Sequence, residues 1–274
     1  MPEGPEIHRA ARKLGRLLEG QVIEELFVAF EHLKSPCKDL EGRRIMAVEA
    51  HGKAILNRFD NGLNIYSHNQ LYGLWRLVRR GQTPDTNRQL RLALHTEQHS
   101  ALLYSASDIE LLRDAELATH SYLTRLGPDV LQQQVSLETV QSQVEEQRFQ
   151  GRSLTSLLLD QGFLAGLGNY LRSEILFVAG IGPDFRLKDC NEAQKTALSR
   201  ASLLLPRRSF ETGGITNDDE RVEQLKEQGR SGRGLRFSVF EREGESCYEC
   251  GTTIEKIKAG GRRLYYCPRC QPAK

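Results

Sequence analysis

Apolar and polar side chains alternate along this chain with two different periodicities. From Ile7 to Leu18 apolar residues recur every three or four positions, with arginines and a lysine between them. That spacing places an apolar stripe on one side of a helix, and Gly20 is a suitable stop. We therefore predict a first amphipathic helix near the amino terminus.

Between about Val22 and Leu103 the pattern changes to short β-prone runs separated by Gly, Asn and Asp. Examples are VIEELFVAF, RRIMAVEA and LRLALHT. Runs of this length, bounded by turn residues, are typical of strands in all-β domains. This part of the sequence predicts a β-sandwich or barrel.

After a Gly-Pro-Asp turn in residues 125–131 the chain becomes largely helical. The helical stretches are SLETVQSQVEEQ, SLTSLLLDQ, NYLRSEILFVAG and NEAQKTALSRASLLL. In the last one Asn191 and Gln194 are spaced as a capping box, and Pro206 is the predicted stop. Residues 211–236 then bring five glycines and mixed charges, which indicate a mobile loop.

These changes of pattern predict an α+β protein with several domains. Residues 1–124 form a β-sandwich domain with a leading helix, and residues 125–214 form a helical domain. A polar flexible loop, residues 215–236, precedes a small carboxy-terminal finger at residues 237–274.

Composition excludes several classes of protein. The chain has 274 residues, of which 39% are hydrophobic, and a net charge of +2 from 38 basic and 36 acidic residues. This charge is too small to indicate a nucleic-acid partner by itself, so the distribution of charge matters more. Neither a signal peptide nor a membrane span is evident, and we expect a cytoplasmic protein whose six cysteines stay reduced.

Four of the cysteines have the spacing of a zinc site. Cys247, Cys250, Cys267 and Cys270 form the pattern C-x2-C-x16-C-x2-C. Four thiolates can hold one Zn²⁺ tetrahedrally and leave no open position for a substrate, so this ion is structural. Cys37 and Cys190 lie outside the pattern and are interpreted as ordinary thiols.

Three further stretches allow a functional and a purely structural interpretation. After Glu255 every charged side chain is basic, which fits either a phosphate-binding hairpin or a solvated face. The glycine-rich turn before Asn169 could bind a phosphate or could only allow tight helix packing. In SHNQLYGLW, Leu71 and Trp75 could lie in the core, or Gln70, Leu71 and Tyr72 could form a wedge that enters a duplex.

The opening residues MPEGPE are also open to two interpretations. Proline and carboxylates suit the first turn of a helix. Removal of Met1 would, however, leave Pro2 with a secondary amine, which can attack a sugar aldehyde carbon. A terminal amine has a pKa of roughly 7.7 to 8.0, so a useful fraction is free base at neutral pH. Glu3 is next to it and suits the proton transfers of sugar-ring opening.

Taken together, these motifs resemble those of the formamidopyrimidine-DNA glycosylase and endonuclease VIII family of bifunctional DNA repair enzymes. The resemblance runs from PEGPEI through HGKAIL, LGPDVL and LLLDQGFLAGLGNYLRSEIL to RFSVFEREGESCYECG and the last cysteines. It implies an N-terminal β-sandwich, a helix-two-turn-helix domain and a zinc finger, with DNA as partner. The consecutive Gln70, Leu71 and Tyr72 are similar to the endonuclease VIII branch.

The resemblance also implies roles for individual residues. Pro2 corresponds to the nucleophile, Glu3 to the general acid and base, Glu6 to a second active-site carboxylate, and Lys53 to a lysine used in binding and catalysis. Asn169 and Arg262 correspond to a pair that grips phosphates around the everted nucleotide, and Gln70, Leu71 and Tyr72 to the residues that fill the void it leaves.

The implied activity is removal of oxidised pyrimidines from double-stranded DNA and β,δ-elimination at the abasic site, through a Schiff base on Pro2. We expect a monomer that acts on nucleoid DNA in the bacterial cytoplasm. Two alternatives stay open, namely the same chemistry with a preference for oxidised purines, and a non-catalytic DNA-binding protein. Residues 215–236 are longer and more polar than expected for this branch, which leaves the lesion preference least determined.

Overall fold

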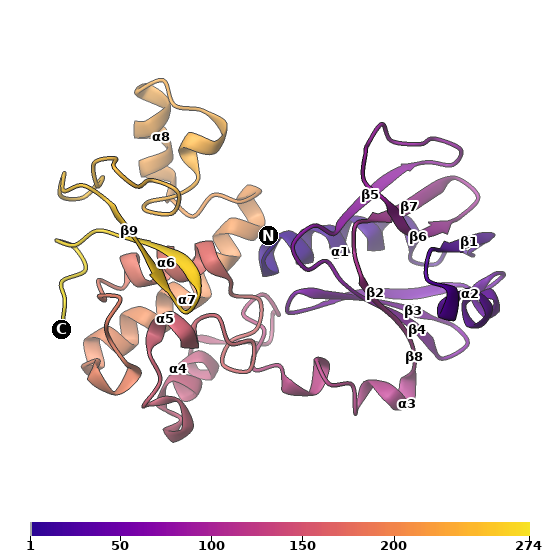
Figure 1. Ribbon diagram of the computed structural model, residues 1–274, viewed down its shortest axis with the longest axis horizontal. Coiled ribbons are helices and arrows are strands. Elements are labelled where there is room, and N and C mark those ends of the chain that lie inside the picture. Colours follow the sequence, from indigo (N-terminus) through magenta and orange to yellow (C-terminus); the bar gives the residue numbers. More distant parts are fainter. Residues whose placement is uncertain (1) are drawn as a thin grey trace. The chain divides into compact units, whose positions relative to one another are not determined.

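The structure is a computed structural model that describes residues 2–274 (Figure 1). The expected removal of Met1 concerns a residue outside this range. The chain forms two compact units. The amino-terminal unit contains Pro2 and Glu6–Arg125, and the carboxy-terminal unit contains Leu126–Lys274 together with Glu3–Pro5. Among the described residues, no helix combines the length and the apolar character needed to cross a bilayer.

The amino-terminal unit is a β-sandwich of two antiparallel four-stranded sheets, as predicted. One sheet has the order β1 (Glu25–Val28), β6 (Leu90–His95), β7 (His99–Tyr104) and β5 (Leu74–Arg79). The other has the order β2 (Ile45–His51), β3 (Ala54–Phe59), β4 (Leu63–His68) and β8 (Asp108–Arg113). Two short helices, α2 (Glu31–Cys37) and α3 (Asp114–Leu117), complete the unit.

The predicted first helix is α1 (Gly4–Leu18), which begins three residues before the apolar stripe. The stripe is buried, with Leu14 and Leu18 fully inaccessible, and it packs in one core with side chains from both sheets. Burial of such a stripe contributes about 25 cal/mol per Å² of apolar surface removed from water. The pattern of apolar residues therefore explains how α1 is held on the sandwich.

The carboxy-terminal unit is mainly helical (Figure 1). Its helices are α4 (Leu137–Glu145), α5 (Leu154–Leu157), α6 (Asn169–Val178), α7 (Glu192–Thr212) and α8 (Asp219–Glu227). The hairpin of β9 (Glu255–Ala259) and β10 (Arg262–Tyr266) follows. Helix α6 is the centre of this unit, since eight of its ten residues are buried.

Two predictions about this unit were wrong. Helix α7 does not stop at Pro206 but continues to Thr212 and ends at Gly213, which has a positive φ of 79°. An internal proline costs about 3 kcal/mol because it removes one hydrogen bond. Here Pro206 is itself buried, as are Leu198 and Leu205 of the same helix, and the burial of α7 outweighs a local signal. The capping box of Asn191 and Gln194 is present as predicted.

The second wrong prediction is the structureless loop at residues 215–236. This segment contains helix α8 and a short 3-10 turn at Gly232–Leu235. Asp218 caps α8 by accepting a hydrogen bond of 2.8 Å from the backbone N–H of Arg221. Leu225 anchors the helix, because it is 1% exposed. A single buried leucine in a polar helix leaves almost no periodic signal in the sequence.

Candidate functional site

Glu3 is held by the beginning of helix α6. It is 2% exposed, and its carboxylate accepts hydrogen bonds from the backbone N–H groups of Tyr170 at 2.8 Å and Leu171 at 3.3 Å. The first N–H groups of a helix have no partner within the helix and carry its positive end. A carboxylate is therefore stabilised at this position. Pro2 is half-buried and directly precedes it.

The glycine-rich turn before α6 makes this contact possible. The N–H of Gly4 donates to the carbonyl of Gly166 at 2.7 Å, and a Cβ on Gly4 would lie only 2.7 Å from Cα of Gly166. A Cβ on Gly168 would lie 2.3 Å from the carboxyl carbon of Glu3. The glycines thus allow two backbone segments to approach closely. The turn therefore packs tightly, and its partner is the segment Glu3–Gly4.

Asn169 begins α6, and its side chain is oriented by Arg172. The sequence motifs did not single out this arginine. Arg172 is fully buried, and its guanidinium donates to the side-chain oxygen of Asn169 at 2.8 Å. It also donates to the carbonyls of Thr155, Ala259 and Arg263 at 2.9 to 3.0 Å. Burial is the main cause that lowers the pKa of Arg172 to about 10, followed by the nearby Arg262. The group therefore remains charged at neutral pH.

These hydrogen bonds join α6 to the hairpin that carries Arg262. Ala259 ends β9 and Arg263 follows Arg262 in β10, so Arg172 contacts the backbone on both sides of the hairpin turn. Arg262 itself is exposed. Asn169 and the backbone beside Arg262, which is 93 positions further along the chain, are thereby bonded to one common group. An arginine inside the apolar run NYLRSEIL was the one available sequence signal for it.

Lys53 and Glu6 belong to the amino-terminal unit. Lys53 lies in the turn between β2 and β3 and is 8% exposed. Its backbone N–H donates to the hydroxyl of Tyr122 at 2.9 Å. Glu6 lies in the first turn of α1 and forms an ion pair of 2.7 Å with Arg9.

The loop between β4 and β5 presents the three predicted wedge residues to solvent. Leu71 is 55% exposed and Tyr72 is 69% exposed, whereas Trp75 is 9% exposed. The alternative that placed Leu71 in the core is therefore wrong, while Trp75 does lie there. Gln70 has a positive φ of 49°. This conformation costs energy for a residue other than glycine, and it persists only where the surroundings impose it.

His68, a second residue that the sequence analysis missed, supports this loop. Its Nδ1 accepts a hydrogen bond of 3.0 Å from the backbone N–H of Gln70. The side-chain oxygen of Gln70 also accepts one of 2.6 Å from the hydroxyl of Ser107. Burial, and after it the charge of Lys53, lowers the pKa of His68 to about 4. His68 therefore stays neutral and able to accept this hydrogen bond at physiological pH.

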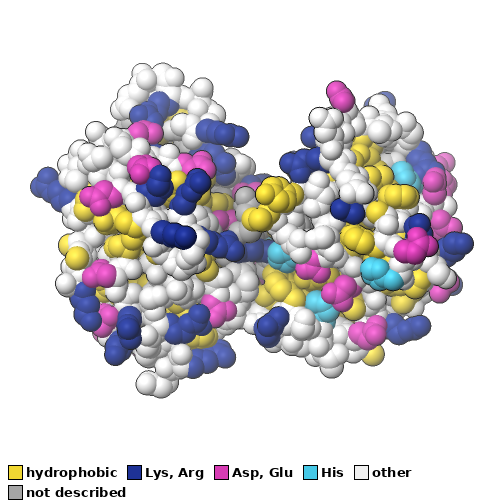
Figure 2. Space-filling model, viewed as in Figure 1, with side chains coloured by type: hydrophobic (Ala, Val, Ile, Leu, Met, Phe, Trp, Pro, Cys, Tyr) yellow, Lys and Arg dark blue, Asp and Glu magenta, His cyan; other side chains and the backbone are white. Residues whose placement is uncertain are grey.

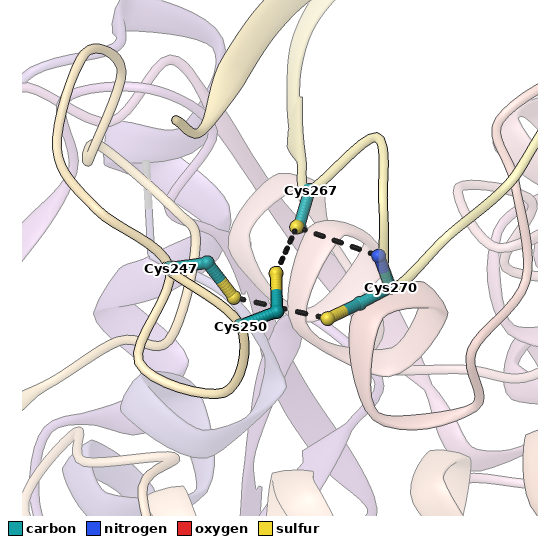
Figure 3. Close-up of side chains that lie close together, drawn as sticks. All are labelled: Cys247, Cys250, Cys267 and Cys270. Atoms are coloured by element: carbon teal, nitrogen blue, oxygen red, sulfur yellow. Dashed lines mark hydrogen bonds between the residues drawn. The ribbon is translucent and has the colours of Figure 1, made fainter. Parts of the chain in front are cut away.

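The four predicted zinc ligands come together around one point (Figure 3). Cys247 and Cys250 precede β9, and Cys267 and Cys270 follow β10. Their sulfur atoms all lie within 4.8 Å of one another, with 3.9 Å between Cys247 and Cys270 and 3.4 Å between Cys250 and Cys267. Four Zn–S bonds of about 2.3 Å in a tetrahedron would place the sulfurs roughly 3.8 Å apart. The site fits one structural Zn²⁺.

Comparison with known proteins gives the family. Residues 1–107 match the formamidopyrimidine-DNA glycosylase N-terminal domain, and residues 126–220 match the H2TH domain of the same enzymes. The chain belongs to the formamidopyrimidine-DNA glycosylase family. Residues 244–273 match a zinc finger found in FPG and IleRS, in agreement with the four-cysteine site. The protein is accordingly a DNA glycosylase and abasic-site lyase of base excision repair.

Close relatives place the chain in the endonuclease VIII branch of the formamidopyrimidine-DNA glycosylase family. Endonuclease 8 of Salmonella heidelberg (strain SL476) and that of Salmonella enteritidis PT4 (strain P125109) are each 47% identical to it over 271 residues, which cover 99% of this chain and 100% of the relative. The fold is similar to that of Lactococcus lactis Fpg in complex with DNA containing an oxidised pyrimidine. The TM-score is 0.81 at 21% identity, with 99% of this chain and 100% of that one covered.

The close approach of Gly168 to Glu3 predicts a specific loss in this glycosylase. Gly168→Ala should displace the Glu3 carboxylate. Because we expect Glu3 to act in the reaction, and a misplacement of 1 Å costs about 100-fold, abasic-site incision should fall by about that factor. Gly151→Ala is the matched control, since a Cβ there meets no atom within 4 Å. Single-turnover incision assays measure both. Equal rates for the two variants would show that the position of Glu3 does not matter.

The lowered pKa of His68 predicts a pH dependence of stability. The pKa of His68 is about 4 in the folded protein, against the usual value of 6.5 for a histidine in water. As the pH falls, the unfolded chain therefore binds the proton first. Above about pH 6.5 this pKa shift does not change the free energy of unfolding. Between about pH 6.5 and pH 4 it lowers that free energy progressively. Urea unfolding should show the wild type losing stability relative to His68→Asn in this window. A constant difference from pH 7 to pH 4.5 would contradict the shifted pKa.

Proposed function

We propose that this glycosylase removes oxidised pyrimidines from duplex DNA, with the secondary amine of Pro2 as the nucleophile and Glu3 as the general acid and base. One observation carries the proposal. The residue next to Pro2 is a buried carboxylate whose oxygens are fixed by two backbone N–H groups of α6. Such a fixed carboxylate beside a terminal amine supplies the two groups that amine catalysis on a sugar requires.

The proposed reaction begins when the lone pair of the Pro2 nitrogen attacks C1′ of the damaged nucleotide. The bond from C1′ to the base breaks, and the base leaves with a proton. Opening of the sugar ring then gives an iminium ion, for which Glu3 supplies the proton to the ring oxygen. Loss of a C2′ proton expels the 3′ phosphate, and a second elimination expels the 5′ phosphate. The products are a one-nucleotide gap and a sugar fragment that water releases from Pro2.

The remaining predicted site residues receive roles that their positions support. Lys53 assists binding and catalysis, and Glu6 is a second carboxylate of the active site. Asn169 and Arg262 bind backbone phosphates near the everted nucleotide, supported by their common connection to Arg172. Gln70, Leu71 and Tyr72 fill the space that this nucleotide leaves, supported by the exposure of Leu71 and Tyr72. Everting a damaged base costs a few kcal/mol, and an exposed apolar wedge offsets part of this cost.

We also propose that the protein acts as a monomer on nucleoid DNA in the bacterial cytoplasm. The relatives in Salmonella are bacterial proteins, and the proposed reaction needs one DNA duplex and one chain. Sedimentation of the protein with and without an abasic-site duplex measures the stoichiometry directly.

Borohydride trapping tests the proposed chemistry. Reduction of the iminium ion on a duplex with one thymine glycol should give a covalent complex of one chain and one DNA strand, with the adduct on Pro2 in peptide mass spectra. No adduct with enzyme of verified amino terminus would exclude the Pro2 nitrogen as the nucleophile. Lesion preference needs a separate comparison, in which excision of dihydrouracil should exceed that of 8-oxoguanine opposite cytosine. The reverse order would favour the oxidised-purine alternative.

The phosphate contact of Arg262 has a measurable signature. Each phosphate neutralised by the protein releases counterions, so log K falls with log salt by about 0.9 per contact. Arg262→Ala should flatten this slope by about one unit, while Arg262→Lys should keep it, because the charge is retained. Fluorescence anisotropy with an abasic-site duplex at several salt concentrations measures the slope. Equal slopes for wild type and Arg262→Ala would exclude this contact.

A further inference from the structure

Residues 218–235, here called the arm, leave the carboxy-terminal unit and return to it at a closed neck. The backbone N–H of Thr216 donates to the carbonyl of Arg236 at 2.8 Å, and the side chain of Asn217 donates to the carbonyl of Leu235 at 3.0 Å. Two sides of the chain are thus paired where the arm begins and ends. The arm is a separate projection that contains α8 (Figure 1).

One buried carboxylate in α6 fixes the neck. Glu174 is 1% exposed and accepts a hydrogen bond of 2.7 Å from the hydroxyl of Thr216. It also accepts hydrogen bonds of 2.8 to 2.9 Å from the backbone N–H groups of Ser238, Val239 and Phe240. Hydrogen bonds to a charged acceptor are worth about 1.5–3 kcal/mol each. The base of the arm is therefore rigid.

The arm also docks on the first zinc knuckle, residues 247–250. Arg221 of α8 forms an ion pair of 2.9 Å with Glu249. Arg230 donates to the hydroxyl of Tyr248 at 3.3 Å, and Arg242 lies over the ring of Tyr248 at 3.4 Å from its centroid. Tyr248 and Glu249 are the two residues between the zinc ligands Cys247 and Cys250. Their side chains are therefore oriented by the metal site and in turn orient the arm.

A hollow of about 210 Å³ lies between the end of the arm and the segment that follows it, residues 236–245. Its apolar lining includes Phe237 and Phe240. Its charged lining consists of four arginines and two glutamates, namely Arg230, Arg233, Arg236, Arg242, Glu241 and Glu245. The lining therefore has two more positive than negative charges. Figure 2 shows Lys and Arg side chains gathered on the drawn face of this unit, around the α8 region and below it.

Two of the four arginines are already engaged with a carboxylate, and two are not. Arg230 and Arg242 both form ion pairs with Glu245, at 3.0 and 3.3 Å. Arg236 donates to the carbonyl of Gly214 at 2.8 Å and stacks on the ring of Phe237. Arg233 is exposed, and within residues 2–274 no ion pair is described for it. Each of the two glutamates offsets one of the four positive charges, so the excess is spread over the lining. Within the described part of the chain, Arg233 and Arg236 are the two of these arginines for which no ion pair is described.

We propose that this hollow binds a phosphate group of the DNA backbone, through the guanidinium groups of Arg233 and Arg236. Guanidinium groups present paired N–H donors that match phosphate oxygens. Glu241 and Glu245 compete for these donors, and the four arginines of the lining outnumber them. The arm then adds one phosphate contact to those proposed for Asn169 and Arg262. Tyr248 and Glu249 act as positioning residues, because they hold the arm at the rim of the hollow. This inference rests on the proposed function, which supplies the DNA.

The salt dependence of DNA binding tests the contact. On an undamaged duplex, Arg233→Ala should reduce the slope of log K against log salt by about 0.9, and Arg233→Lys should restore most of it. Lys226→Ala is the matched control, since Lys226 is an exposed cation of the same arm that pairs with Glu223 at 2.7 Å and does not line the hollow. Equal slopes for wild type and Arg233→Ala would overturn the proposal.

Removal of the docking ring tests the positioning role. Tyr248→Ala should increase amide hydrogen exchange in residues 219–227 by at least about tenfold. The salt slope should fall as it does in Arg233→Ala, with one zinc per chain retained. Tyr248→Phe should keep most of the protection, because the ring remains and only the hydrogen bond from Arg230 to the hydroxyl is lost. Unchanged exchange in Tyr248→Ala would refute the docking.

Borohydride trapping at low salt separates this proposal from the proposed function. Arg233→Ala should still form the covalent adduct, because the hollow holds no reacting group. Absence of the adduct in the wild type would instead contradict the proposed chemistry.

Discussion

A Gly-Ser extension ahead of Pro2 should reduce strand incision by at least about 1,000-fold and abolish borohydride trapping. The extension turns the Pro2 nitrogen into an amide, whose lone pair is delocalised and no longer nucleophilic. Loss of covalent catalysis of this kind removes several orders of magnitude in rate. Incision of an abasic-site duplex under single-turnover conditions measures the effect.

The same two residues added after Lys274 are the control for this extension, and they should leave incision unchanged. Because an extension could also disturb the contact between Gly4 and Gly166, a second variant is needed. Pro2→Ala, made without the extension, keeps a free terminal amine at the same position, now a primary one. It should form a trapped adduct, although more slowly. Undiminished incision by the extended protein would disprove the role of the Pro2 nitrogen.

Replacement of one zinc ligand should have the second large effect. Cys250→Ser should lower the zinc content from one per chain to nearly zero and abolish DNA binding. Apart from the sulfur ligands, the core of the finger contains only a few apolar residues, among them Val239, Ile254 and Tyr265. Metal binding contributes about 10–16 kcal/mol to folding in small zinc fingers, so such a core does not replace it. Elemental analysis and anisotropy titrations measure both quantities.

Cys190→Ser is the matched control for the zinc variant. Cys190 is a buried thiol of the same unit, away from the four-cysteine site, and burial raises its pKa to about 11. This variant should keep one zinc per chain and bind DNA as the wild type does. If Cys250→Ser retained its zinc, the assignment of four cysteine ligands would be wrong.

Features with short-range signals were predictable from the sequence. The zinc ligands are two pairs of neighbours with fixed spacing, and the cap of α7 is formed by Asn191 and Gln194, three positions apart. The burial of α1 follows from an apolar stripe. Pro206 shows the limit of this approach, since a local stop signal was outweighed by the burial of a helix whose Leu205 packs in a core with residues that are distant in the chain.

By itself, the sequence determined the zinc site, the β-sandwich, most of the helices and the family, because each of these depends on spacing between near neighbours or on motifs in a fixed order. Only the tertiary structure decided how Glu3 is held, how Arg172 connects Asn169 to the hairpin, and where the arm docks. The hydrogen bond from Tyr170 to Glu3 spans 167 positions, and that from Arg172 to Ala259 spans 87. No periodic pattern encodes such pairs, since they form only when the carboxy-terminal unit has folded around α6.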